Sequence, residues 1–179
     1  MNKYNRVALI RRGVSVALLV AGGSLSPVNG QSADEAKAPA VEADARVKKA
    51  LDAAGLKYVV TSLGNFRVSF DLGNERSHWV FVSSRTDQFE QLETRRLWAT
   101  VMKSKDPLSQ ETTSKLLMDN INQKLGAFEL SKDDDGTYKV SYSAKVDADC
   151  RPDALRDAIR LVLHAADAKE KELTGKDEF

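Results

Sequence analysis

The sequence predicts an α+β fold in which an antiparallel sheet carries its helices on one face. Two segments, residues 64–72 and 137–146, alternate between apolar and polar side chains, which is the pattern of a strand with one buried face. Short turns join the predicted strands, and strands joined in this way pair antiparallel. Stretches with apolar residues at helical spacing lie before, between and after the strands. The expected order is α-β-β-β-(β)-α-β-β-α.

The first half of this order begins with a helix over residues 42–54, where Val47 and Leu51 recur at helical spacing. Strands are expected over residues 57–62, 64–72, 79–82 and 94–102. The segment 79–82 is apolar on both faces, which predicts a central strand. Residues 94–102 fit a helix or a strand, and we favour a strand because the segment lacks helix caps and contains bulky and β-branched residues.

The second half contains two helices and a hairpin. A helix beginning at Ser109 is expected to end at Gly126 and to bury an apolar stripe. That stripe consists of Leu117, Ile121 and Leu125, widened by Leu116. Residues 133–136 (Asp-Asp-Asp-Gly) are typical of a hairpin turn, which joins a strand over 127–130 to the strand over 137–146.

The last helix is expected to begin at Pro152, a residue common at the first helical position, and to run to about Leu173. Its predicted buried stripe consists of Leu155, Ile159, Val162 and Ala166. Acidic and basic residues three or four positions apart, such as Asp167 and Lys171, are expected to form ion pairs on its solvent-exposed side.

Residues 1–30 have the layout of a cleavable signal peptide. A basic start is followed by an uncharged apolar stretch over residues 13–25 and by small residues before a cleavage point near Gly30. The apolar stretch is shorter than the ~20 residues that span a bilayer, so an uncleaved anchor is the weaker interpretation. Arg11 and Arg12 leave a twin-arginine route open beside the general secretory one. We therefore expect a periplasmic or secreted protein without a membrane span after cleavage.

Removal of this leader changes the charge of the chain. The full sequence of 179 residues has 27 basic and 26 acidic side chains. Four basic and no acidic residues belong to positions 1–30, so the mature chain has 23 basic against 26 acidic side chains, a net charge of about −3. A nucleic-acid partner is therefore not expected. Residues 31–44 are predicted to form a flexible linker, residues 45–173 one α+β domain, and residues 174–179 a tail.

Several of these segments together resemble the YbjN family. The resemblance is carried by the strands at 64–72 and 79–82, by Lys-Leu-Gly-Ala-Phe at 124–128 leading into a hairpin, and by Pro-Asp-Ala-Leu at 152–155. It covers roughly residues 45–173. The family is known as bacterial sensory transduction regulators and is similar in fold to type III secretion chaperones. This resemblance implies a chaperone-like fold and a regulatory or chaperone-like binding role, and it transfers no catalytic residues.

Trp79, Phe81 and Trp98 form the candidate binding surface. Aromatic residues on strands commonly pack in the core, but a sheet face without helices would expose them to a partner. We expect a protein or peptide partner, including a second copy of the chain in a homodimer. The alternative is a small-ligand sensor with an apolar pocket between the sheet and the helices, near Trp79 and Trp98.

Cys150 is the candidate reactive thiol. It lies just before Pro152 at the start of a predicted helix, where the helix dipole lowers the pKa of a thiol. In an oxidising compartment an unpaired cysteine could join two chains, so any covalent dimer is expected to use Cys150. The alternative is that Cys150 is an incidental small residue at the helix entrance.

No catalytic or metal site is predicted, and no cofactor is expected. His78 and His164 are the only histidines, and the sequence lacks the spacing of zinc motifs and of a nucleophile elbow. Residues 131–142 fail as a calcium loop because Tyr142 stands where a glutamate is required. A hydrolase with an unrecognised serine site is the weakest alternative. The basic residues Arg95, Arg96, Lys103 and Lys105 are expected to form a solvated edge.

Overall fold

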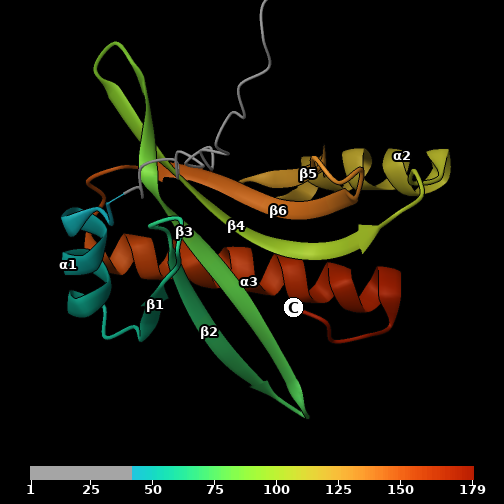
Figure 1. The fold of residues 1–179 in the computed structure, drawn as a ribbon, viewed down its shortest axis with the longest axis horizontal. Helices are drawn as coiled ribbons and strands as arrows, with labels where there is room; N and C mark the ends of the chain where they lie inside the picture. The colour runs from blue at the N-terminus through green and yellow to red at the C-terminus, as the bar shows by residue number, and fades with distance from the viewer. Residues whose placement is uncertain (1–41) are drawn as a thin grey trace, which may run out of the picture. The chain divides into compact units, whose positions relative to one another are not determined.

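The computed structural model describes residues 42–179, and within them it confirms the α+β class (Figure 1). The predicted signal peptide and most of the linker lie outside the described residues. Six strands form one sheet in the order β1-β2-β3-β4-β6-β5, and every neighbouring pair is antiparallel. The strands are β1 Tyr58–Val60, β2 Phe66–Gly73, β3 Arg76–Phe89, β4 Leu92–Ser104, β5 Ala127–Lys132 and β6 Tyr138–Asp147. The segment 94–102, ambiguous in sequence, is therefore a strand, and 79–82 belongs to a much longer one.

The described part also contains three α-helices, α1 Ala45–Ala53, α2 Gln110–Asp119 and α3 Pro152–Thr174, and one short 3-10 helix. Each α-helix begins at a local signal. Asp44 caps α1 and Ser109 caps α2, their side chains accepting hydrogen bonds from backbone N–H groups in the first turn. Pro152 opens α3, as expected, and Gly175 ends it in the left-handed conformation. Among residues 42–179, no helix combines the length and the apolar character that crossing a bilayer requires.

The helices contribute to a core on one face of the sheet. In Figure 1, α3 runs lengthwise along β4 and β6, with α1 near its first turns and α2 beside β5. The predicted stripe of α3 is buried, as are alternate residues of the central strands, including Val80, Val82, Leu97 and Ala99. Because successive strand residues point to opposite faces, their neighbours Trp79, Phe81 and Trp98 lie on the other face.

The region after Ser109 differs from the prediction. The α-helix ends at Asp119 and continues as the short 3-10 helix η1 Asn120–Asn122. Leu116 is buried, but Ile121, expected in the buried stripe, is 87% exposed, and Leu117 is exposed as well. The side chain of Asn120 explains the break, because it accepts a hydrogen bond from the backbone N–H of Phe128 at 2.7 Å and donates one to its carbonyl at 3.3 Å. This pairing ties the end of the helix to β5.

Gly126 has a different role from the predicted helix stop. It lies beyond η1, just before β5, with φ of +84°. A Cβ atom at this position would be 2.1 Å from the carbonyl oxygen of Ser143 on β6. The close passage of two backbone segments, and not only the left-handed conformation, therefore requires glycine here.

We expect Gly126→Ala to destabilise the fold far more than Gly136→Ala. Gly136 has the same conformation, with φ of +83°, but an added Cβ would meet only the end of Lys132 at 4.0 Å. Gly136→Ala, the control, should lose about 1–2 kcal/mol of unfolding free energy from backbone strain. Gly126→Ala should lose at least about 2 kcal/mol more because β5 must move from β6. Urea unfolding measures both, and equal losses would contradict the close-passage argument.

Candidate functional site

The predicted aromatic residues lie together on the sheet face opposite the helices, which we call the open face. We define it by Arg67, Trp79, Phe81, Arg96 and Trp98. Phe81 on β3 pairs in register with Trp98 on β4, and their rings stack with centroids 5.3 Å apart. Trp79 is 39% exposed. The structure thus brings all three predicted residues to one surface.

Two arginines lie over the tryptophans of the open face. The guanidinium carbon of Arg67 is 4.6 Å from the ring centroid of Trp79, and that of Arg96 is 5.2 Å from the ring of Trp98. Such cation–π contacts hold the long side chains against the rings. Arg96 also forms an ion pair with Glu129 at 2.5 Å. The open face therefore combines apolar ring surface with positive charge.

A separate cavity of about 280 Å³ lies between α1 and the start of α3. Its wall is mostly apolar, with contributions from Val47, Ala50, Ala148, Pro152 and Leu155, and it includes the basic residues Arg46, Lys49 and Arg95. Cys150 lines this cavity and is half-buried. The small-ligand hypothesis from the sequence expected an apolar pocket near Trp79 and Trp98. This cavity lies near Cys150 instead.

The pKa of Cys150 differs from the expected direction. Burial of the thiol, together with the charge of Asp147, raises its pKa, and Arg95 offsets this only in part. Burial therefore opposes the lowering of the thiol pKa that is expected from the position before α3. Cys150 is thus a cavity-lining thiol, and its reactivity stays a prediction.

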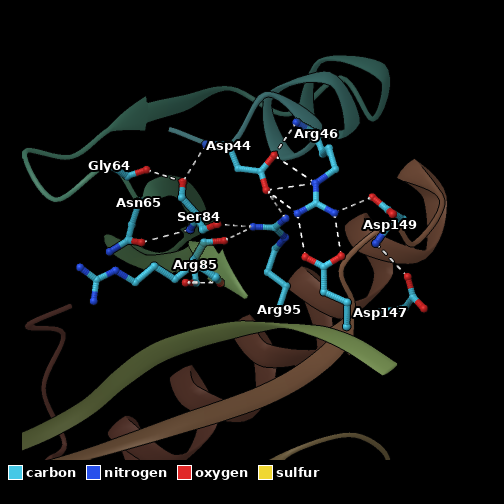
Figure 2. Close-up of polar contacts among 11 residues, drawn as sticks. Asp44, Arg46, Gly64, Asn65, Ser84, Arg85, Arg95, Asp147 and Asp149 are labelled. Carbon is cyan, nitrogen blue, oxygen red and sulfur yellow. Dashed lines mark hydrogen bonds and ion pairs between the residues drawn. The ribbon is translucent and has the colours of Figure 1, made fainter. Parts of the chain in front are cut away.

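Arg95 is the main correction to the predicted solvated edge. It is 1% exposed, because it points from β4 toward the helices. Its Nη1 donates to the carbonyl oxygens of Ser83 and Ser84 at 2.5 and 3.1 Å, and its Nη2 donates to Asp44 at 2.6 Å (Figure 2). A buried guanidinium is tolerated only when it is paired and hydrogen-bonded in this way.

Arg46 extends this arrangement into a group of four charges, Asp44, Arg46, Glu93 and Arg95, which we call the Arg95 cluster. Arg46 binds Glu93 through two parallel hydrogen bonds of 2.9 Å and also contacts Asp44 and Asp149 (Figure 2). Partial burial by itself raises the pKa of Asp44, but hydrogen bonds from Arg46 and Arg95 outweigh it and lower that pKa to about 2. Hydrogen bonds from Arg46 likewise lower the pKa of Glu93 to about 2.

The two histidines have different surroundings. His164 is exposed on α3, as expected. His78 is fully buried on the inner face of β3, with its Nδ1 3.2 Å from Oε2 of Glu170, which is also fully buried. Burial lowers the pKa of His78, against the attraction of Glu170 and Asp167. Together these three residues supply groups that can ligate a metal ion.

Sequence patterns did not reveal this buried group. Asp167 was expected to pair with Lys171, four residues along α3, but it binds Arg76 at 2.6 Å instead. His78 and Glu170 belong to elements far apart in the chain, and no local motif relates them. The one available signal was the polarity of Glu170 on the apolar side of α3, four residues after Ala166.

We expect Asp44→Asn to reduce the unfolding free energy by about 2–3 kcal/mol at pH 7 and to have little effect near pH 2. Asparagine still caps α1, so the change removes the charge facing Arg95 and preserves the cap. Because the pKa of Asp44 is lower in the folded chain than in the unfolded one, its contribution is present above about pH 4 and is lost as pH falls toward 2.

Urea unfolding of both chains at several pH values between 7 and 2 measures this difference. Asp134→Asn, at the exposed β5–β6 turn, serves as the control and should leave the pH dependence unchanged. Parallel pH profiles for wild-type protein and Asp44→Asn would show that the Arg95 cluster does not stabilise the fold.

Comparison with known proteins assigns this chain to a family. The family model of YbjN, described as "Putative bacterial sensory transduction regulator", matches residues 43–174. A search of curated proteins finds no match. The matched range begins just before the Asp44 cap and ends at the last residue of α3, so it includes every helix and strand described above. The chain therefore belongs to the YbjN family.

Proposed function

We propose that this protein is an exported, non-enzymatic regulatory module that binds a protein or peptide partner through its open face. The observation that carries the proposal is the clustering of Trp79, Phe81 and Trp98 on the sheet face opposite the helices, with arginines over two of the rings. The regulatory description of the family supports a binding role.

The chemistry of the open face favours a partner segment that combines apolar and acidic side chains. Aromatic residues and arginine are enriched at protein interfaces, because they offer large contact areas at a modest entropic cost. Arg67 lies over Trp79, so an acidic side chain of the partner can pair with the guanidinium while an apolar neighbour covers the ring. A second copy of the chain is one protein that could occupy this face, as a homodimer.

Export is supported by the character of residues 1–30. We express the chain with its leader in a bacterial host. We expect to recover it from the periplasm, with the mass of a chain whose first residue is near Gln31. Leu18→Arg with Leu19→Arg should interrupt the apolar stretch and leave the full-length chain inside the cell.

The conservative pair Arg11→Lys and Arg12→Lys is the matched control. It preserves the basic start required for general secretion but removes the twin arginine. Unchanged export of this variant identifies the general secretory route, and its loss identifies the twin-arginine route. Intact mass spectrometry of the cell fractions measures each case, and a full-length chain in the cytoplasm in all cases would contradict export.

We expect a cross-linking group placed on the open face to capture a partner protein, and the same group placed elsewhere on the molecule to capture little. A photo-crosslinking amino acid at Ser69, an exposed residue that pairs with Trp79 in the sheet, should capture a protein in periplasm. The same group at Glu111, exposed on α2, should capture little. Trp79→Ser should reduce capture at Ser69 by about tenfold or more, because it removes the exposed ring of the surface.

Phe89→Ser is the matched control for this variant. Phe89 lies at the far end of the same strand and is 73% exposed, so its loss removes a comparable exposed aromatic ring away from the open face. Equal effects of the two substitutions would contradict a specific surface. A cross-linked product of twice the chain mass would identify the partner as a second copy of this chain.

A small-ligand sensor is the second candidate, and the cavity beside Cys150 favours it. The wall is mostly apolar, and Arg95, which contributes to it, has an Nε atom without a hydrogen-bond partner among the described residues. A compact apolar molecule with one acceptor group suits this wall. Such a ligand should raise the unfolding temperature and slow alkylation of Cys150, whereas a partner on the open face should leave Cys150 reactivity unchanged.

A further inference from the structure

We propose that His78, Asp167 and Glu170 form a binding site for a divalent transition-metal ion, with zinc as the best match. This group, the His78 cluster, lies on the helix side of the sheet, opposite the open face. His78 belongs to β3, and the two carboxylates belong to α3. A metal ion here would join the strand directly to the helix.

The distances suit a metal ion. Nδ1 of His78 and Oε2 of Glu170 are 3.2 Å apart. Two ligand atoms at about 2.0–2.1 Å from zinc in a tetrahedral arrangement are separated by about 3.3 Å. One ligand atom from each of the three residues lies within 4.8 Å of the others, so the longest of these separations needs to shorten by up to about 1.5 Å when the ion binds. Asp167, whose side chain is 21% exposed, has room for that movement.

The buried atoms are poorly satisfied. Among residues 42–179, neither ring nitrogen of His78 nor Oε2 of Glu170 makes a hydrogen bond of good geometry, although both residues are fully buried. The backbone of Thr100 and the carboxylate of Glu170 lie close enough to favour the charged form of His78 and raise its pKa against the effect of burial, but neither contact is well aligned. The contact between them has the distance of an ion pair but not the geometry of a hydrogen bond. Buried polar atoms without partners destabilise a fold, and a metal ion would satisfy both residues at once.

The charges around the cluster also favour a divalent cation. Arg76 lies 2.6 Å from Asp167, 3.7 Å from Glu170 and 3.8 Å from Asp177. Three carboxylates and one guanidinium give a net charge of −2 when the imidazole is counted as neutral. An ion of charge +2 balances this sum. Arg76 binds only Oδ1 of Asp167, so it orients that carboxylate and leaves Oδ2 for the metal.

The C-terminal segment closes the cluster. The backbone N–H of Glu178 donates to Oε1 of Glu170 at 2.7 Å, and the carbonyl of Lys176 accepts from Arg76 at 3.0 Å. This leaves Oε2 of Glu170 directed to His78. Nitrogen and carboxylate ligands together favour zinc over magnesium or calcium, which prefer oxygen ligands alone. Three protein ligands leave a fourth position for water.

The test is metal binding by the full exported chain after treatment with a chelator. Calorimetry with Zn²⁺ should show one ion per chain, and Co²⁺ should develop the visible absorption of a tetrahedral site. At a hundredfold excess over its dissociation constant, Zn²⁺ should raise the unfolding temperature by about 5–10 °C. Absence of a saturable one-to-one event would overturn the proposal.

Variants locate the ion. His78→Gln and Asp167→Asn should each weaken Zn²⁺ binding by about a hundredfold or more. His164→Gln, which changes the exposed histidine on α3, and Cys150→Ser should bind as the wild type does. Asp167 is partly exposed, so Asp167→Asn carries the test if His78→Gln fails to fold. Wild-type affinity in Asp167→Asn would show that the ion binds elsewhere and would overturn the proposal.

Discussion

The burial of Arg95 is the constraint on which the arrangement of the helices depends. A guanidinium under the helices needs partners for its charge and its N–H groups, and its two Nη groups find them in Asp44 and in two carbonyls of β3. Because Asp44 is also the cap of α1, the pair fixes the start of that helix relative to β3 and β4. The same helix supplies Val47 and Ala50 to the wall of the cavity beside Cys150. A single charge thus positions a helix and one wall of a pocket.

The one-sided packing of the helices divides the strands into two chemistries. The inner residues of β3 and β4 are mostly small or branched apolar side chains, which pack against α3. The outer residues include the rings of Trp79, Phe81 and Trp98, and arginines lie over the two tryptophans. Strand alternation makes this division possible without any irregularity of the backbone. Val80 and Phe81 are consecutive residues of β3, and their side chains point to opposite faces of the sheet. The core can therefore stabilise the fold while the other face remains available for binding.

Sequence patterns were sufficient for local features and insufficient for distant pairings. Alternation over residues 137–146 predicted β6 because that signal lies within one strand. The helix from Ser109 was extended too far, since its apolar spacing carried no sign that Asn120 bonds to β5 and leaves Ile121 exposed. Arg95 appeared solvated because its partner Asp44 lies on another element. The His78 cluster was missed for the same reason, as nothing near His78 in sequence indicates that α3 brings two carboxylates to it.

Strand β3 connects the two proposed sites. His78 and Trp79 are consecutive residues that point to opposite faces, the first toward α3 and the second toward the open face. If a metal ion that draws His78 toward Glu170 shifts this stretch of backbone, the shift reaches the Trp79 ring, and a partner bound at Trp79 acts on His78 by the same route. If the ion changes partner affinity by some factor, linkage requires the partner to change ion affinity by the same factor. Such reciprocity would allow a regulator to report a metal ion to a protein partner.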